Sequence, residues 1–445
     1  MHVLIQVRPT ALPTMSFEAT AALDSPPVEL EGLADVGFVL DERYAPVVVP
    51  AVRAPFAGGL GLALGHQPDL SFEAADISSL VRGTIPEGDE QNPVVSELLT
   101  RPEVMGVFAD PVVEAMPTCG GDPPVGNDAD VARLLDCAQL HADGFTGEGV
   151  RVAVVDSGIN AAHLASRGHT NAVDVSNSFT PAGVLSQPGA HGLGHGTMCS
   201  FDIGIAAPEA VLLDHAVLLS RTPGQVAIQG LLSDAVRSFS QLRALLHSED
   251  GPPLVVSNSW GVFDPAWDFP VGHPGNYTDN PGHPFNLIVS SLERAGADIL
   301  FAAGNCGVDC PDGRCRFMQL PICGANSHPA VLSIAGIDVK DARVGYSSQG
   351  PGRISADKPD VCSYTHFKGS EVFGTGTPDS GTSAACPVAA GVVAAIRTRV
   401  SHSALTPAQL RALIQRTATD LGHVGFDHDH GWGALTPPAL VAALP

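Results

Sequence analysis

The stretch Gly381-Thr382-Ser383-Ala384-Ala385-Cys386-Pro387 is the part of the chain from which the fold can best be inferred. It leads directly into an apolar run of small residues, 388–396, which predicts a buried helix. Ser383 would then stand at a helix N-terminus, where free backbone N–H groups and the helix dipole favour developing negative charge. Because serine is also a common helix cap, this stretch indicates a nucleophile only if partner residues occur elsewhere.

Apolar strands and helices alternate from residue 130 onward. Strands are predicted at 150–155, 210–218, 253–256, 298–303 and 330–337, and helices at 230–247, 286–297, 383–400 and 407–417. Fully apolar strands that alternate with helices indicate a mostly parallel sheet covered on both faces, an α/β fold. Functional groups in such sheets lie beyond the carboxyl ends of the strands.

The first 116 residues have a different pattern. Short strands are predicted at 3–7, 36–40, 47–49 and 104–108, with a helix at 93–100, which suits a small α+β domain. A segment rich in Pro, Gly and Asp follows at 117–128 and reads as a linker. The sequence thus predicts a domain at 1–116, a linker at 117–128 and a second domain at 129–445.

Composition excludes several classes of protein. The 445 residues are 44% hydrophobic and 16% charged, which is typical of a globular chain, and the net charge of −24 argues against nucleic acid as a partner. No apolar run approaches the roughly 20 residues that span a bilayer, and no signal peptide is visible. We therefore expect a protein without membrane partners that is cytoplasmic or exported by another route, although nine cysteines leave the compartment open.

Two residues in suitable settings precede Ser383. Asp156 follows the buried strand 151–155, where a carboxylate could hold a histidine in the required tautomer, or could simply cap the strand end. His195 stands between two glycines and could act as a general base toward Ser383. A lone histidine in this setting would more simply be a loop residue.

Asn305 completes the set. It follows the end of the strand at 298–303, where its side-chain amide could donate to an oxyanion beside the backbone N–H of Ser383. The simpler interpretation is a turn asparagine. Taken together, Asp, His, Asn and Ser in this order form a pattern that no single residue would establish.

The chain resembles the subtilisin-like serine proteases (subtilases, peptidase family S8). The resemblance runs from about residue 129 to the C-terminus and is carried by Val154-Val155-Asp156-Ser157-Gly158, Gly194-His195-Gly196-Thr197, Ala303-Gly304-Asn305, Gly381–Pro387 and Gly431-Trp432-Gly433-Ala434-Leu435. It implies a three-layer fold with a mostly parallel central sheet. It also implies a serine endopeptidase in which Asp156, His195 and Ser383 are catalytic, Asn305 supplies the oxyanion hole, and the reaction passes through an acyl-enzyme.

The resemblance also implies how substrate binds. Ser259, Trp260 and Gly261 would pair with the substrate backbone, and Ala302, Ala303 and Gly304 would form the opposite wall of the S1 pocket. Backbone pairing favours extended or unfolded polypeptides as substrates. The chemistry requires no cofactor, and structural calcium is common in the family, although no residues here have recognisable calcium-loop spacing.

The segment 102–113 resembles the end of a subtilase inhibitor-type propeptide. This resemblance implies a ferredoxin-like N-terminal domain that acts as an intramolecular inhibitor, a protein made as a zymogen, and processing within about 114–128. The alternative is a permanent accessory domain.

Four cysteines follow Asn305 in a segment that the ordinary family pattern lacks. Cys306, Cys310, Cys315 and Cys323 could form one or two disulfides, bind zinc or remain free thiols, and disulfides are favoured because no paired C-x₂-C unit is present.

Two rival functions follow from the same residues. A catalytically silent peptide-binding protein of this fold, kept latent by its N-terminal domain, is one. An α/β-hydrolase esterase is the other, and it is disfavoured because Ser383 lacks the Gly-x-Ser-x-Gly elbow.

Overall fold

The structure, a computed structural model, describes residues 1–8, 30, 32–50, 77–86, 92–115, 122–220, 229–246, 251–317 and 319–445. Two sheets dominate this part of the chain, and we call them the main sheet and the N-terminal sheet. A third, three-stranded sheet connects them.

The main sheet has six parallel strands in the order β14-β13-β12-β10-β7-β8. They are β7 Arg151–Val155, β8 Val211–His215, β10 Leu254–Asn258, β12 Asp298–Ala302, β13 Leu332–Ile337 and β14 Val361–Tyr364. The parallel α/β sheet predicted from the sequence is therefore present. Only the four-residue strand β14 was not predicted, because so short a run gives little periodicity.

Alternation along the strands explains the two helical layers. Val152 and Val154 of β7 share a buried cluster with α6 His195–Ala206 and α9 Thr382–Arg397. Ala153 and Val155 of β7 instead join a cluster with α7 Leu232–Leu246 and α8 Pro284–Arg294. Successive side chains point to opposite faces, so a strand apolar at every position needs cover on both sides.

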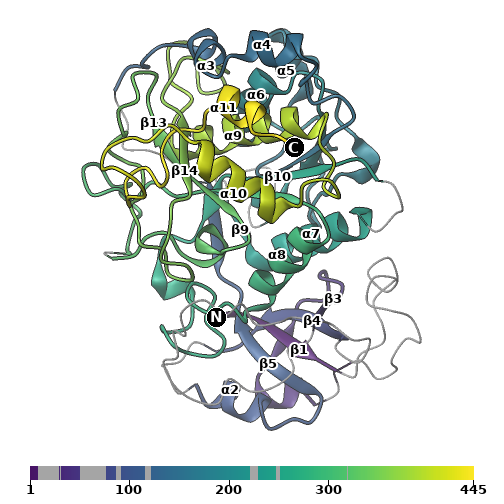
Figure 1. The fold of residues 1–445 in the computed structure, drawn as a ribbon. Helices are drawn as coiled ribbons and strands as arrows, with labels where there is room; N and C mark the ends of the chain where they lie inside the picture. The colour runs from purple at the N-terminus through teal and green to yellow at the C-terminus, as the bar shows by residue number, and fades with distance from the viewer. Residues whose placement is uncertain are drawn as a thin grey trace.

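Five shorter or peripheral helices of the described chain after residue 127 lie outside these layers. They are α3 Asp128–Leu134, α4 Cys137–Ala142, α5 Ala161–Ser166, α10 Pro407–Thr417 and α11 Pro437–Ala442. The bounds of α10 are those predicted, because Pro407 at its first turn and the capping box of Thr406 with Gln409 define its start. Figure 1 shows α10 and α11, in yellow, close to the C-terminus.

The N-terminal sheet is antiparallel. It contains β1 His2–Val7, β2 Val39–Leu40, β3 Val47–Pro50, β4 Ile77–Thr84 and β5 Val104–Ala109, with α2 Pro93–Leu98 between the last two strands. The prediction of a strand at 36–40 was too long, since a 3₁₀ turn occupies Ala34–Val36. Parts of 1–116 and of the linker 117–128 lie outside the described residues, so the ferredoxin-like assignment and the domain boundaries stay predictions.

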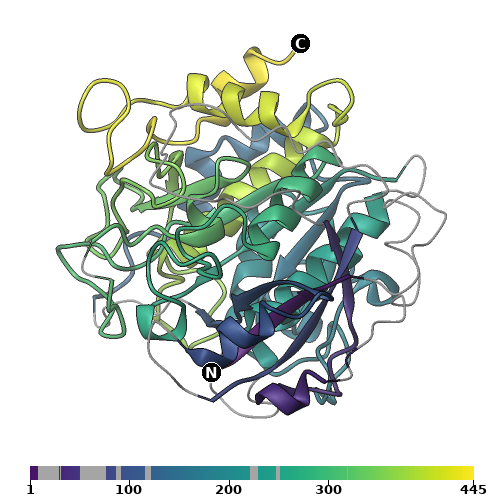
Figure 2. The same cartoon turned by 90° about the horizontal axis from the view of Figure 1, so that it is seen from below.

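The two faces of the N-terminal sheet pack against different partners. Val3, Ile5 and Val7 face a cluster that includes Leu98 of α2. Leu4, on the opposite face of β1, belongs to the same buried cluster as α7 and α8. Figures 1 and 2 show the purple N-terminal strands against these two helices. The N-terminal sheet thus buries one of its faces on the second unit of the chain.

The third sheet joins the two units directly. Strand β6 Val112–Ala115 lies between β11 Trp260–Gly261 and β9 Gln229–Leu231 and is antiparallel to both. The N-terminal unit therefore ends in a strand held between two segments of the second unit.

Candidate active site

The candidate site lies where three strands of the main sheet end. Asp156 follows β7, Ser259 follows β10 and Asn305 lies three residues beyond β12. After β7 the chain adds β8 on one side of that strand and β10 on the other. This reversal is a topological switch point, the usual position of sites in open α/β sheets.

Asp156 and His195 are in contact, as the sequence predicted. Nδ1 of His195 lies 2.9 Å from each carboxylate oxygen of Asp156, and both side chains are buried. An imidazole nitrogen that faces a carboxylate carries the proton, so Nε2 is the acceptor nitrogen. Nε2 is also buried and has no hydrogen-bond partner among the described residues. The ring is therefore held in the tautomer that a general base requires.

A close backbone approach explains the glycine after His195. A Cβ on Gly196 would lie 2.6 Å from the carbonyl oxygen of Gly158, in the turn that follows Asp156. The N–H of Gly196 also donates to Oγ of Ser157 at 2.9 Å. Helix α6 can begin beside the Asp156 turn only because this position has no side chain.

Ser383 is the second residue of α9. It is buried, and its Oγ lies 3.5 Å from the carbonyl oxygen of Ser259. Its own carbonyl accepts from Oγ of Ser259 at 3.1 Å and from the thiol of Cys199 at 3.5 Å. The residue before the helix, Gly381, has φ 81°, which a residue with a side chain rarely adopts. The start of α9 is thus fixed against the end of β10.

Thr382 orients Asn305. Oδ1 of Asn305 accepts from the backbone N–H of Thr382 at 2.9 Å and from its hydroxyl at 3.1 Å. The same hydroxyl accepts from the N–H of Gly304 at 3.0 Å. Because Oδ1 of Asn305 is held in this way, Nδ2 points from the opposite side of the side-chain amide. The sequence indicated Asn305 but not this role of Thr382. The one signal for Thr382 was its position directly before Ser383 in the same motif.

The thiol of Cys199 lies beneath the Asp156–His195 pair. Its sulfur is 3.7 Å from Oδ2 of Asp156 and 3.7 Å from Nδ1 of His195. Burial, and secondarily the nearby Asp156 carboxylate, raise the pKa of Cys199 well above its ordinary value. The group is therefore a neutral thiol. The three ligand atoms of Asp156, His195 and Cys199 lie within 4.8 Å of one another, a set that could also hold a metal ion.

The segments expected to contact substrate lie at neighbouring strand ends. Trp260 and Gly261 form β11, and the Trp260 side chain is buried against Phe285 and Phe301, so only its backbone faces β6. Nδ2 of Asn326 donates to the carbonyls of Trp260 and Ala302, at 2.9 Å each. This amide fixes the spacing between the two segments, and no local motif in the sequence indicated it.

The expected opposite wall begins at Ala302, the last residue of β12. The N–H of Ala303 donates to Ile334 of β13, and Gly304 adopts φ 108°. Ser259 is buried and donates to the carbonyl of Ser383 at the start of α9. The assignment of Ala302, Ala303 and Gly304 to an S1 wall stays a prediction.

The cysteine segment forms a disulfide-closed loop. Cys306 and Cys315 are bonded to each other, and Cys310 is also in a disulfide. Cys323 is a free, buried thiol whose pKa burial raises to about 12, so its inclusion with the other three was wrong. Because three of the four sulfurs are in disulfides, a four-thiolate zinc site is not available in this loop.

Comparison with known proteins agrees with this arrangement. The model of the subtilase family matches residues 147–433, which include Asp156, His195, Asn305 and Ser383. This chain belongs to the subtilase family. The fold expected from the resemblance, with its six-stranded parallel sheet, is therefore that of a subtilase.

Individual subtilases are similar over the same region. The chain is 29% identical over 320 residues to human membrane-bound transcription factor site-1 protease, covering 68% of this chain and 26% of that protein. It is 27% identical over 286 residues to subtilisin E of Bacillus subtilis, covering 64% of each. With subtilisin of Bacillus pumilus it shares 28% identity over 287 residues, 64% of this chain and 88% of that one.

In the described part of this subtilase, no helix is long and apolar enough to cross a bilayer.

Proposed function

We propose that this subtilase is a serine endopeptidase that cleaves extended or unfolded polypeptides. The observation that carries the proposal is the bond of His195 Nδ1 to both carboxylate oxygens of Asp156, which leaves Nε2 as the acceptor nitrogen. The thiol of Cys199, 3.7 Å from that Nδ1, is also 3.5 Å from the carbonyl oxygen of Ser383 and so connects this pair to the start of α9. This constellation supplies a nucleophile, a base and a group that orients the base.

The proposed reaction has two halves. Oγ of Ser383 attacks the scissile carbonyl carbon while Nε2 of His195 takes the hydroxyl proton. The resulting oxyanion accepts from Nδ2 of Asn305 and from the N–H of Ser383. His195 then gives its proton to the leaving amine as the C–N bond breaks, which leaves an acyl-enzyme. Water repeats the sequence on the ester, and Asp156 stabilises the imidazolium in both halves. No step requires a metal or a cofactor, and structural calcium remains an expectation from the family without assigned residues.

We also propose that the N-terminal unit keeps the enzyme latent as an intramolecular inhibitor. Strand β6 lies between β9 and β11, and its pairing with Trp260 and Gly261 uses the backbone groups expected to pair with substrate. A strand added to an exposed edge in this way resembles a bound peptide. The N-terminal unit would then have to leave before substrate could enter. Of the expected processing region, 114–128, residues 116–121 lie outside the described residues.

An active-site probe tests the catalytic assignment. A fluorophosphonate should label the wild-type protein at Ser383, and the Ser383→Ala variant should not be labelled. Casein hydrolysis should fall about a millionfold in Ser383→Ala and about ten-thousandfold in Asp156→Asn, which would retain the geometry but favour the wrong histidine tautomer. Ser403→Ala, an exposed serine, is the matched control. A wild-type protein that binds peptides but is never labelled would support the silent binder instead.

Intact mass tests the zymogen proposal. Active wild-type protein should have lost its N-terminal unit, whereas Ser383→Ala should keep its full mass. Equal masses would refute self-processing and favour a permanent accessory domain.

A further inference from the structure

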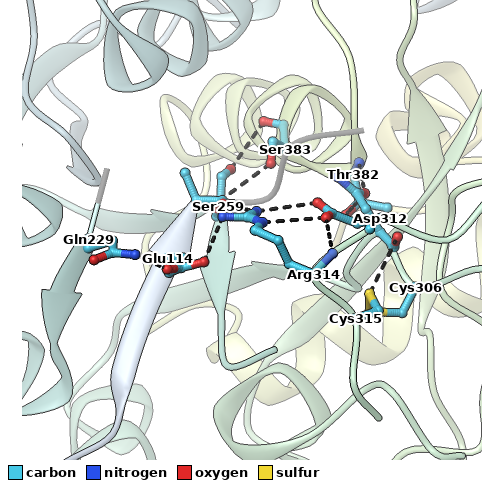
Figure 3. Close-up of polar contacts among 12 residues, drawn as sticks. Glu114, Gln229, Ser259, Cys306, Asp312, Arg314, Cys315, Thr382 and Ser383 are labelled. Carbon is cyan, nitrogen blue, oxygen red and sulfur yellow. Dashed lines mark hydrogen bonds and ion pairs between the residues drawn. A yellow bond between two sulfur atoms is a disulfide. The ribbon is translucent and has the colours of Figure 1, made fainter. Parts of the chain in front are cut away.

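An acidic side chain of β6 is buried against the second unit. Glu114 is only 2% exposed, although carboxylates are rarely buried unless they are paired. Its Oε2 accepts from the Arg314 guanidinium at 2.6 Å, and Oε1 accepts from the side-chain amide of Gln229. Figure 3 shows both groups converging on this carboxylate. Arg314 and Gln229 of the second unit therefore form a binding site for a carboxylate.

The guanidinium is held by contacts that do not depend on Glu114. Asp312 accepts from Nε at 3.4 Å and from the terminal nitrogen at 3.3 Å, and the group lies 4.7 Å from the centre of the Phe263 ring. Arg314 immediately precedes Cys315 of the Cys306–Cys315 disulfide. The cation is therefore already positioned, and it would stay in place after β6 has left.

Arg314 also contacts the backbone of β6. Arg314 donates to the carbonyl of Ala115 at 2.8 Å, beside its bond to Glu114. A single arginine thus contacts a side chain and the following peptide group, which fixes the register of an acidic residue.

The register places this binding site relative to Ser383. Ala115 lies opposite Trp260 and Glu114 lies opposite Gly261 in the antiparallel pairing. In a substrate bound in the same register, the residue opposite Ser259 is next to Ser383, whose Oγ is 3.5 Å from the Ser259 carbonyl. The residue opposite Gly261 then lies two positions closer to the substrate N-terminus.

We propose that Arg314 and Gln229 form a subsite that selects an acidic side chain two residues before the residue whose carbonyl Ser383 attacks. This inference rests on the proposed function, and it assigns a substrate class to it: polypeptides with Glu or Asp at that position. The protein carries a net charge of −24, so a cation at this point makes an acidic residue favourable where the rest of the surface repels it. The rival role for Arg314 is docking of the N-terminal unit alone.

A set of matched peptides tests the subsite. Four quenched fluorogenic peptides are built on the sequence Val-Val-X-Ala, with X as Glu, Gln, Ala or Lys, and the cleaved bond is identified by mass spectrometry. The wild-type protein should cleave the Glu peptide with a kcat/KM about tenfold above that of the Gln peptide, and the Lys peptide should be the poorest. Arg314→Gln should bring the Glu/Gln ratio close to one.

Two further variants separate the subsite from a general loss of structure. Arg314→Lys keeps the charge but not the fork of donors, so it should retain part of the preference. Arg316→Gln removes a charge from the same loop, where the Arg316 guanidinium bonds to the carbonyls of Gly313 and Cys315, and it should keep the wild-type ratio.

Binding to Ser383→Ala makes the inference independent of cleavage. Labelled Glu and Gln peptides are titrated by fluorescence anisotropy, and because β6 competes equally with both, their affinity ratio reports the subsite. Tighter binding of the Glu peptide without any cleavage by the wild type would refute the proposed function and keep the subsite. Equal kcat/KM for the Glu and Gln peptides would overturn the subsite and leave the protease standing.

Discussion

The main sheet and the N-terminal sheet each have two apolar faces, and they bury these faces in different ways. The main sheet covers its faces with α6 and α9 on one side and α7 and α8 on the other, all from residues 195–397. The N-terminal sheet covers one face with its own α2 and the other with α7 and α8. The second unit can therefore bury both faces of its sheet with its own helices. The N-terminal unit needs helices of the second unit to bury one of its faces.

The largest expected effect comes from separating the two. A fragment of residues 1–116 should show no cooperative thermal transition by circular dichroism, because the face that includes Leu4, Tyr44, Val49 and Leu80 would be exposed to water. A fragment of residues 122–445 should keep its protected amide core in hydrogen exchange. Cooperative melting of the short fragment would contradict the comparison.

A smaller effect is expected from the charges between the units. Arg82 of β4 donates to Asp234 of α7 at 2.9 Å and to Asp41 at 2.9 Å, and both Arg82 and Asp234 are buried. Arg82→Ala would leave the Asp234 carboxylate buried without its cation, so it should lower the free energy of unfolding by about 3–5 kcal/mol. Urea denaturation measures this change in the Ser383→Ala background, which keeps the N-terminal unit.

The control is Arg43→Ala, which removes an exposed arginine from the same Asp41. It should change the free energy of unfolding by less than about 1 kcal/mol. Equal effects of the two variants would show that the N-terminal unit does not rely on this buried contact.

The Cys306–Cys315 loop carries Arg314, which contacts β6 where the two units meet. The Cys306→Ser/Cys315→Ser variant reopens a loop with a sequence separation of 9, so it should lower the free energy of unfolding by about 2–3 kcal/mol. It should also reduce the Glu/Gln preference, because Arg314 would lose its anchor. Unfolding in denaturant and the matched peptides measure the two effects, and an unchanged peptide preference would show that Asp312 and Phe263 suffice to hold Arg314.

The smallest effect is a dependence of docking on pH. Burial raises the pKa of Asp110 to about 7, while Arg82 opposes that rise and Asp234 adds to it. The docked state therefore binds a proton that the undocked state has lost above pH of about 4. Docking should weaken as pH rises from about 4 to about 7 and then level off.

Asp110→Asn should flatten this pH profile. Oδ1 of Asp110 accepts from the N–H of Ser233 at 2.8 Å, a bond that an amide oxygen can also accept. The thermal midpoint is measured from pH 4 to pH 8 for Ser383→Ala, which keeps the N-terminal unit, with and without Asp110→Asn. A midpoint of Ser383→Ala that rises over this range would contradict the assignment.

The sequence predicted elements and residues that carry local signals. Asp156, Asn305 and Ser383 each lie next to an apolar strand or helix, so a single motif indicated both the residue and its position. The sequence also predicted that Asp156 and His195 would meet, because a carboxylate at a buried strand end can hold a histidine in the required tautomer and the family resemblance makes both residues catalytic. Their catalytic role, like the subsite, awaits the tests given above.

What the sequence did not predict depends on contacts across space. Asn326 acts by bridging Trp260 and Ala302, and Arg314 acts by reaching Glu114, which is 200 residues away in the chain. Such pairs leave no periodicity and no spacing to detect. Cys323 shows the opposite error. Its closeness in sequence to three bonded cysteines suggested that it belongs to the same disulfide or zinc loop, whereas it is a free buried thiol whose sulfur faces the carbonyl of Val262.

The position of β6 has a consequence for kinetics. A strand that is part of the same chain competes with substrate at a local concentration on the order of millimolar, whatever the protein concentration. Dilution would therefore not release activity, and micromolar substrate would compete poorly. Progress curves from freshly made protein should show a lag whose length reflects loss of the tether and does not shorten as more substrate is added.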